Sequence, residues 1–107
     1  MLVEFAIIPT DTVRMGRDVA IVVQVLRSTG LNFQVGPMST CIEGDWEPVL
    51  DAIRRCHEAV AEQHERVITT ITIDHRKHFH HSLADAVASV NQWHPPQEGS
   101  GANSAPM

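Results

Sequence analysis

GPMSTCIEGD, residues 36–45, contains a turn, a strand and the start of a helix. Its Gly-Pro pair predicts a tight turn, because glycine tolerates positive φ and proline fixes its own φ without donating a hydrogen bond. From Met38 to Glu43 the side chains alternate between two directions, as a strand requires. Asp45 is then a suitable N-cap for a helix that continues to about His64. The chain therefore reverses in a hairpin and passes directly into a helix.

The same patterns predict the elements on either side of this stretch. We expect strands at Leu2–Ile8, Leu31–Val35 and Val67–Ile73, a helix over Asp18–Arg27, and a last helix capped by Ser82. The order is βαββαβ with an additional C-terminal helix. This order predicts an α+β, ferredoxin-like fold, in which both main helices cover one face of a four-stranded antiparallel sheet. The end of the first strand should lie beside the hairpin.

Length and composition are those of one globular domain. The chain has 107 residues, of which 43% are apolar and 20% charged. We expect the domain to span residues 1–93, followed by a flexible tail at 94–107 that is rich in Pro, Gly and Ser. Two cysteines, Cys41 and Cys56, are too few for a disulfide framework and are expected to be reduced.

Charge and hydropathy exclude several kinds of partner. A net charge of -5 argues against binding to nucleic acid through phosphate neutralisation. No apolar run is long enough to cross a bilayer, and Glu4 interrupts the N-terminal apolar stretch. We therefore expect a cytoplasmic protein with neither nucleic acid nor a membrane as partner.

The first strand is apolar on both faces, which is unusual for a sheet covered by helices on one side only. We therefore expect the second sheet face to be buried against another subunit, in a homo-dimer or homo-tetramer. Glu4 is the exception in this strand, and it lies either at a solvated edge or within a site. Arg76 either pairs with Asp74 or Glu43 at the strand ends or forms an acid-base set with Asp74, Glu43 and Glu4, and the sequence leaves both interpretations open.

Histidines suggest a metal site, but their spacing is not diagnostic. Four of them, His75, His78, His80 and His81, follow the last strand, and neutral imidazoles are good ligands for zinc, nickel or copper. There is no HExxH motif, so a solvated polar loop is the favoured interpretation. The chain also has no GxSxG elbow, P-loop or GxGxxG motif. From its residues alone it is a small oligomeric domain without a recognisable catalytic set.

A resemblance extends this interpretation. The chain is similar to the short, single-domain thiamine-binding proteins related to YkoF, which share a Pro-Met-x-Thr-x-Ile-Glu-Gly-Asp/Glu stretch, a helical His-Glu pair, Arg-Val, and a strand ending in Ile-Asp-x-Arg. The matching residues are Pro37, Met38, Thr40, Ile42, Glu43, Gly44, Asp45, His57, Glu58, Arg66, Val67, Ile73, Asp74 and Arg76. The resemblance covers nearly everything except the tail. It implies a ferredoxin-like protomer, assembled through its sheets, that binds thiamine or its hydroxymethylpyrimidine moiety and is not an enzyme.

Several residues could serve such a ligand. An aminopyrimidine needs an apolar slot, which Phe33 and Met38 could form, and hydrogen-bonding groups for its amino group and ring nitrogen. The resemblance therefore implies roles for the hydroxyls of Thr12, Ser39 and Thr40, and for Glu4 as the carboxylate that binds the aminopyrimidine. No cofactor and no metal is expected.

One departure from the family concerns the connection Thr10–Gly16, which has fewer hydroxyls than usual and places the positive charge of Arg14 near a cationic ligand. A second is Ala86, where the family commonly has a lysine. Two alternatives to ligand binding therefore stay open. One is a structural or regulatory oligomer without ligand, and the other is a metal-responsive module that uses the histidines after the fourth strand.

Overall fold

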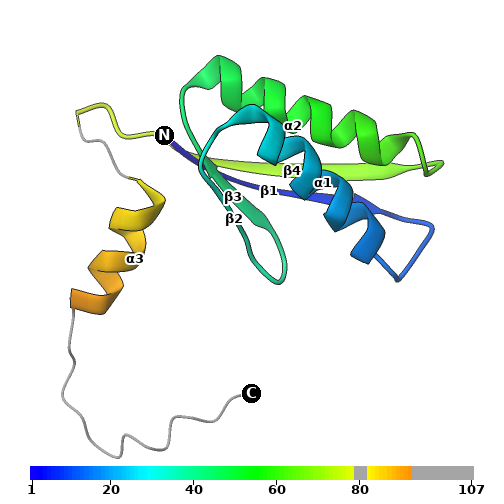
Figure 1. Ribbon diagram of the computed structural model, residues 1–107, viewed down its shortest axis with the longest axis horizontal. Helices are drawn as coiled ribbons and strands as arrows, with labels where there is room; N and C mark the ends of the chain where they lie inside the picture. Colours follow the sequence, from blue (N-terminus) through cyan, green and yellow to red (C-terminus); the bar gives the residue numbers. More distant parts are fainter. Residues whose placement is uncertain (79–81, 93–107) are drawn as a thin grey trace, which may run out of the picture.

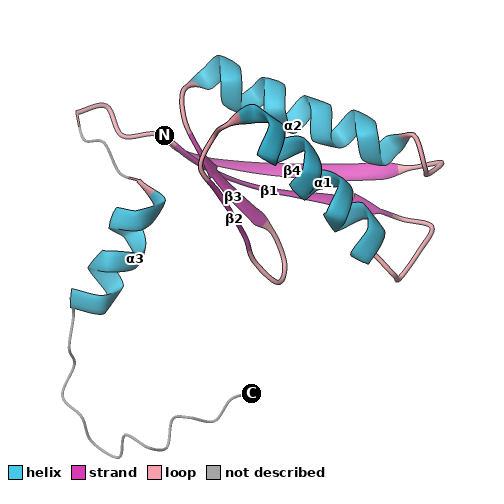
Figure 2. Cartoon of the chain, in the orientation of Figure 1, coloured by secondary structure: helices cyan, strands magenta, loops and turns pink. Residues whose placement is uncertain are grey.

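A computed structural model describes residues 1–78 and 82–92 (Figure 1). The expected tail at 94–107, and His80 and His81 of the expected histidine cluster, lie outside the described residues. The elements are β1 (Leu2–Pro9), α1 (Gly16–Thr29), β2 (Phe33–Val35), β3 (Thr40–Glu43), α2 (Trp46–Ala61), β4 (Val67–Asp74) and α3 (Leu83–Gln92) (Figure 2). The predicted order βαββαβα is confirmed.

The four strands form one antiparallel sheet in the order β2-β3-β1-β4. β1 is central: all eight of its residues pair with β4, and Leu2 to Phe5 also pair with β3. Helices α1 and α2 lie side by side over the same face of the sheet (Figure 1). This is the ferredoxin-like α+β fold that the sequence predicts.

The core lies between this face of the sheet and the two helices. Side chains alternate along β1, so Val3 and Phe5 point toward the helices while Glu4 points to the opposite face, which we call the open face. The buried apolar residues are Val3, Phe5, Val22, Leu26, Ile42, Val49, Ala52, Ile53, Cys56 and Val60. Cys56 is therefore a core thiol, and burial raises its pKa to about 11, which keeps it protonated and unreactive at neutral pH.

The hairpin strands are shorter than predicted. β3 begins at Thr40 rather than Met38, because the backbone N–H of Gly36 donates to the carbonyl of Ser39 at 2.8 Å and closes a turn over residues 36–39. β2 begins at Phe33 rather than Leu31. The N–H of Leu31 instead donates to Thr29 Oγ1 at 3.1 Å, which places it in the helix-ending segment.

Most helix ends are explained by residues that lie next to them in the chain. Gly30, with φ 75°, ends α1 in the left-handed conformation that glycine favours. Asp45 occupies the N-cap of α2 as predicted, although its side chain makes no cap hydrogen bond. At the other end α2 stops at Ala61, before the expected His64. The predicted cap of α3 is confirmed, because the N–H of Asp85 donates to Ser82 Oγ at 3.0 Å.

Val19 and Trp46 are large apolar residues of the helices that are partly exposed. Val19 of α1 is 40% exposed because it faces a cavity at the sheet edge rather than the core. Trp46 of α2 is 46% exposed and makes an edge-to-face contact with the His75 ring, with centroids 5.6 Å apart. Arg76 lies beside the same strand end, with its Nε 3.5 Å from Asp74 Oδ1, in one of the two expected pairings.

The last helix, α3, lies apart from α1 and α2 (Figure 1). The backbone N–H of Leu83, its first residue, donates to Glu43 Oε1 of β3 at 3.1 Å. Within residues 1–78 and 82–92, no helix combines the length and apolar character that crossing a membrane requires.

Candidate ligand-binding site

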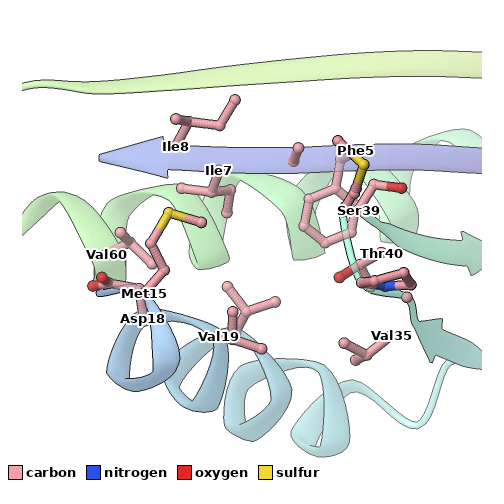
Figure 3. A pocket seen from close by; sticks show the side chains of 15 residues that line it. Phe5, Ile7, Ile8, Met15, Asp18, Val19, Val35, Ser39, Thr40 and Val60 are labelled. Carbon is pink, nitrogen blue, oxygen red and sulfur yellow. The ribbon is translucent and has the colours of Figure 1, made fainter. Parts of the chain in front are cut away.

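A cavity of about 330 Å³ opens where the first turns of α1, the end of β1 and the β2–β3 hairpin meet (Figure 3). We call it the helix-side pocket. Its lining residues are Phe5, Ala6, Ile7, Ile8, Met15, Asp18, Val19, Val22, Val35, Gly36, Pro37, Met38, Ser39, Thr40 and Val60. Its walls are apolar except at Asp18 and at the hydroxyls of Ser39 and Thr40. A cavity of this size, with few polar groups, is suited to a small organic molecule.

The pocket exists because three elements diverge at this end of the sheet. β1 extends four residues beyond its pairing with β3, from Ala6 to Pro9, so the hairpin turns away there and leaves the strand uncovered. The turn at residues 36–39 brings Met38 and Ser39 to the rim. The first turns of α1 close the opposite side with Met15, Asp18 and Val19 (Figure 3).

Thr40 contributes a buried hydroxyl to this pocket. The residue is 7% exposed, and its side chain has no hydrogen-bond partner among the residues that the structure describes. A buried polar group without a partner costs about 1–3 kcal/mol, so such groups in native proteins are commonly satisfied by water or a ligand. The Thr40 hydroxyl is therefore available to a bound molecule.

Asp18 contributes the only carboxylate among the described residues that line the pocket. It is 5% exposed, and its Oδ1 lies 2.8 Å from Nε2 of His64. The other ring nitrogen of His64, Nδ1, lies 2.6 Å from Asp11 Oδ1. A neutral imidazole has one N–H and can donate to only one carboxylate, so this geometry favours the imidazolium form, in which both nitrogens donate.

The electrostatics of this Asp-His-Asp cluster agree with its geometry. The pKa of His64 is raised above its ordinary value of 6.5, mainly by the hydrogen bond to Asp18, against the opposing effect of burial and with further support from Asp11. For Asp11, burial alone would raise the pKa. Hydrogen bonds from His64 and from backbone N–H groups outweigh it, and the pKa falls below 3.8.

The predicted site residues fall into two groups. Met38, Ser39 and Thr40 all line the helix-side pocket, as a ligand role requires. Phe33 and Thr12 do not. Phe33 packs against the core at the edge strand, and Thr12 binds its own turn, with its Oγ1 accepting the N–H of Arg14 at 3.0 Å.

Glu4 lies on the open face and not in the helix-side pocket. It lines a second cavity of about 300 Å³, which we call the open-face cavity, together with Leu2, Val3, Gln34, Cys41, Thr72, Asp74, Leu83, Ala86 and Val87. The pKa of Cys41 is raised there, first by burial and then by the charge of Glu4. Ser39 connects the two cavities, because its Oγ donates to Glu4 Oε2 at 2.8 Å.

The connection after β1 also differs from expectation. Thr10 lies beside the start of β4 rather than beside the hairpin, since its N–H donates to the carbonyl of Arg66 at 3.1 Å. It is Ile7 of β1, on the helix side of the sheet, that lines the pocket together with the hairpin residues. Arg14 is exposed and does not line the pocket, so its charge is directed to solvent.

Sequence reasoning missed Asp18, Met15 and the β1 residues of the pocket. A signal for Asp18 was present: it lies four and eight residues before Val22 and Leu26, the buried residues of α1. That spacing places an acid on the buried stripe of a helix, where an unpaired carboxylate is costly.

Metal coordination finds no support in the described part of the chain, where no three side chains of His, Cys, Asp or Glu are grouped to hold an ion. His57 binds Thr69, with its Nδ1 2.6 Å from Oγ1, and His75 contacts Trp46. Because two histidines of this cluster lie outside the described residues, the structure does not test the alternative of a metal-responsive module that uses them.

The fold and the helix-side pocket define a small ferredoxin-like domain with an apolar cavity that contains a carboxylate and two hydroxyls. The sequence profile of the family described as "Thiamine-binding protein" matches residues 3–91, and the chain belongs to this family. A relative in Mycobacterium tuberculosis, a UPF0045 protein, is 34% identical over 95 residues, which cover 87% of this chain and 93% of that protein.

Solved structures share the fold. A hypothetical protein of Methanocaldococcus jannaschii superimposes with a TM-score of 0.79 at 24% identity, covering 86% of this chain and 96% of that one. A Thermotoga maritima protein provisionally assigned to thiamine biosynthesis or salvage superimposes with a TM-score of 0.72 at 19% identity, covering 83% and 96%. At these identities the likeness establishes the ferredoxin-like architecture of the chain.

Proposed function

We propose that this protein binds thiamine or its hydroxymethylpyrimidine moiety in the helix-side pocket, without converting it, and acts in the cytoplasm as a carrier, buffer or sensor. Membership of the thiamine-binding family supports the ligand class. The assignment of the structurally similar Thermotoga maritima protein to thiamine biosynthesis or salvage agrees with it.

The pocket itself carries the proposal. It combines apolar walls for a flat heteroaromatic ring with two polar groups that are buried and available: the Thr40 hydroxyl and the second carboxylate oxygen of Asp18. Ile7 and Val19 lie between the carboxylate and the hydroxyls, and Phe5 lies beside the hydroxyls (Figure 3). A ligand with an aromatic ring and hydrogen-bonding groups at separate positions fits this arrangement.

Isothermal titration of the metal-free protein with thiamine, and in parallel with hydroxymethylpyrimidine, tests the proposal. We expect saturable binding of at least one ligand at a simple ratio per protomer. Val19→Trp should fill the pocket and weaken binding at least about tenfold. Ala20→Trp is the matched control, because Ala20 is exposed on the same helix and does not line the pocket. Undiminished binding by Val19→Trp would move the site elsewhere, for example to the open-face cavity.

Assembly through the open face is a second part of the proposal. Ile8 of β1 and Ile68 of β4 are direct partners in the sheet register, and they are 40% and 41% exposed on this face. Such exposed apolar pairs on a sheet are suited to burial by another copy of the chain. A homo-dimer or homo-tetramer formed through the open faces would cover them.

Light scattering at micromolar concentration tests the assembly. Ile68→Lys should shift the protein toward monomer, whereas Val13→Lys should not, since Val13 is 97% exposed in a connection away from the sheet. A wild-type protein that assembles but binds neither ligand would favour the alternative function, a structural or regulatory oligomer. A monomeric wild-type protein would contradict assembly and leave ligand binding to be judged by titration.

A further inference from the structure

Asp18 and His64 together suggest how the helix-side pocket chooses its ligand. Asp18 Oδ1 is occupied by His64, whereas the second oxygen, Oδ2, has no hydrogen-bond partner within residues 1–78 and 82–92. Only 5% of the surface of Asp18 is exposed to solvent, and the residue forms part of the pocket wall. A buried carboxylate with a vacant acceptor oxygen is a binding position for a cation or an N–H donor.

We propose that Asp18 selects a cationic ligand in this pocket and that His64 sets the negative charge available to it, so that cation binding is coupled to release of the His64 proton. This inference rests on the proposed function, because it concerns the same pocket. It adds the residue responsible for selectivity and a control of affinity by pH. Asp18 is the binding residue, and His64 is a positioning residue that acts through it.

The coupling follows from the charges around the His64 ring. Asp11 approaches Nδ1 from the connection after β1, and Asp18 approaches Nε2 from α1. Among neighbouring groups, Arg17 of α1 is held by Gln63, with its Nη2 3.0 Å from Oε1, and Glu65 contributes its backbone N–H to Asp11. With His64 protonated, the two carboxylates and the imidazolium sum to one negative charge. Loss of the proton leaves two.

A cation next to Asp18 therefore binds more tightly when His64 is neutral. By linkage, the bound cation must weaken proton binding at His64 by the same factor. The proton leaves to solvent, and the neutral ring keeps one N–H with which it can still hold one of the two carboxylates. An uncharged ligand of similar shape lacks this electrostatic coupling, so its affinity should respond much less to pH.

Ligand charge and pH are varied together in the test. Titrations use thiamine, benzamidinium as an organic cation unrelated to the vitamin, and benzamide as the uncharged isostere of benzamidinium. We expect the affinity for the cations to rise about fivefold between about pH 6 and pH 8, with little change for benzamide. In NMR titrations, the pH at which the His64 ring resonances are halfway through their shift should fall when the protein is saturated with a cation. These resonances are assigned by their loss in His64→Gln.

Variants separate binding from positioning. Asp18→Asn, which keeps the shape but removes the charge, should weaken cation binding at least about tenfold and remove its pH dependence. His64→Gln should bind cations with little pH dependence. The matched control is Asp11→Asn, because Asp11 lies outside the pocket lining. This variant should retain cation affinity at about pH 8, and the pH at which its affinity changes should be lower than in wild type.

The outcomes distinguish this inference from the proposed function. If wild type binds thiamine or hydroxymethylpyrimidine but Asp18→Asn binds the cations equally well, the selectivity inference is wrong and the function stands. If only benzamidinium binds, through Asp18, the inference stands and the vitamin assignment fails. If thiamine, hydroxymethylpyrimidine and benzamidinium all fail to bind, both are overturned. The wild-type pH profile requires no variant, and a flat profile for a bound cation overturns the coupling even if Asp18→Asn does not fold.

Discussion

The hydroxyl of Ser39 donates a 2.8 Å hydrogen bond to the carboxylate of Glu4, across the boundary between the helix-side pocket and the open face of the sheet. Ser39 belongs to the hairpin turn and lines the pocket, whereas Glu4 belongs to β1 and lines the open-face cavity. One hydrogen bond therefore joins the surface proposed to bind the ligand to the surface proposed to assemble with another copy.

Ser39→Ala should reduce ligand affinity about three- to tenfold while changing the free energy of unfolding by less than about 0.5 kcal/mol, because the bond is exposed. Denaturant unfolding and titration with thiamine measure the two effects. Glu4→Gln is the second arm of a double-mutant cycle. If the hydrogen bond positions Ser39 for the ligand, the two changes are not additive in affinity, and additive effects would argue that Glu4 has no influence on the pocket.

The sequence predicted the fold well because its signals are local. Alternation in β1, the Gly-Pro turn and the cap at Ser82 each depend on residues close together in the chain, and the order of elements then leaves few topologies. Errors arose where a hydrogen bond decided a boundary. The bond from Gly36 to Ser39, for example, places Met38 in a turn rather than in a strand.

The site was only partly predictable. Met38, Ser39 and Thr40, which the resemblance predicts as ligand residues, line the helix-side pocket. Glu4 was predicted with them, although it alternates with the buried Val3 and Phe5 and therefore points to the other face. The partnership of Asp18 with His64 joins residues 46 positions apart, at the start of one helix and beyond the end of another. No periodicity encodes such a contact, because it depends on how the two helices pack.

Stability should depend on pH through His64. Its pKa is raised in the folded protein, so its contribution is fully present below its ordinary value of 6.5 and is lost as pH rises through the higher folded value. Asp11 behaves in the opposite sense, because its pKa is lowered and its contribution is lost on acidification below 3.8. We therefore expect the melting temperature of wild type, relative to His64→Gln, to fall as the solution becomes alkaline.

Thermal unfolding of both proteins across this pH range measures the difference. Subtracting the variant removes the contributions of all other groups, which both proteins share. If the melting temperatures of the two proteins changed in parallel above and below pH 6.5, the contacts of His64 with the two aspartates would not stabilise the fold.

Gly44 should be intolerant of any side chain. It has φ 154°, and a Cβ at this position would lie 3.0 Å from Val49 Cγ2 and 3.3 Å from Leu31 Cδ2. Gly44→Ala is therefore expected to destabilise the protein by about 1–3 kcal/mol. Gly16→Ala is the control, since a Cβ there meets nothing within 4 Å and should stabilise by about 0.4–1 kcal/mol. Equal midpoints of the two variants in urea would contradict the crowding at Gly44.

Thr40→Val should separate stability from binding. The Thr40 hydroxyl is buried without a partner among the described residues, so its isosteric replacement by a methyl group removes an unfavourable burial. We expect the free energy of unfolding to stay constant or to rise by about 1 kcal/mol. Affinity for thiamine or hydroxymethylpyrimidine should fall about tenfold, because the bound ligand loses a hydrogen bond.

Thr70→Val is the control, since Thr70 is an exposed residue of β4 that lines none of the described cavities. Urea unfolding and titration on the same preparations measure both quantities. A Thr40→Val protein that is less stable, yet binds as wild type does, would show that the hydroxyl serves the fold and not the ligand.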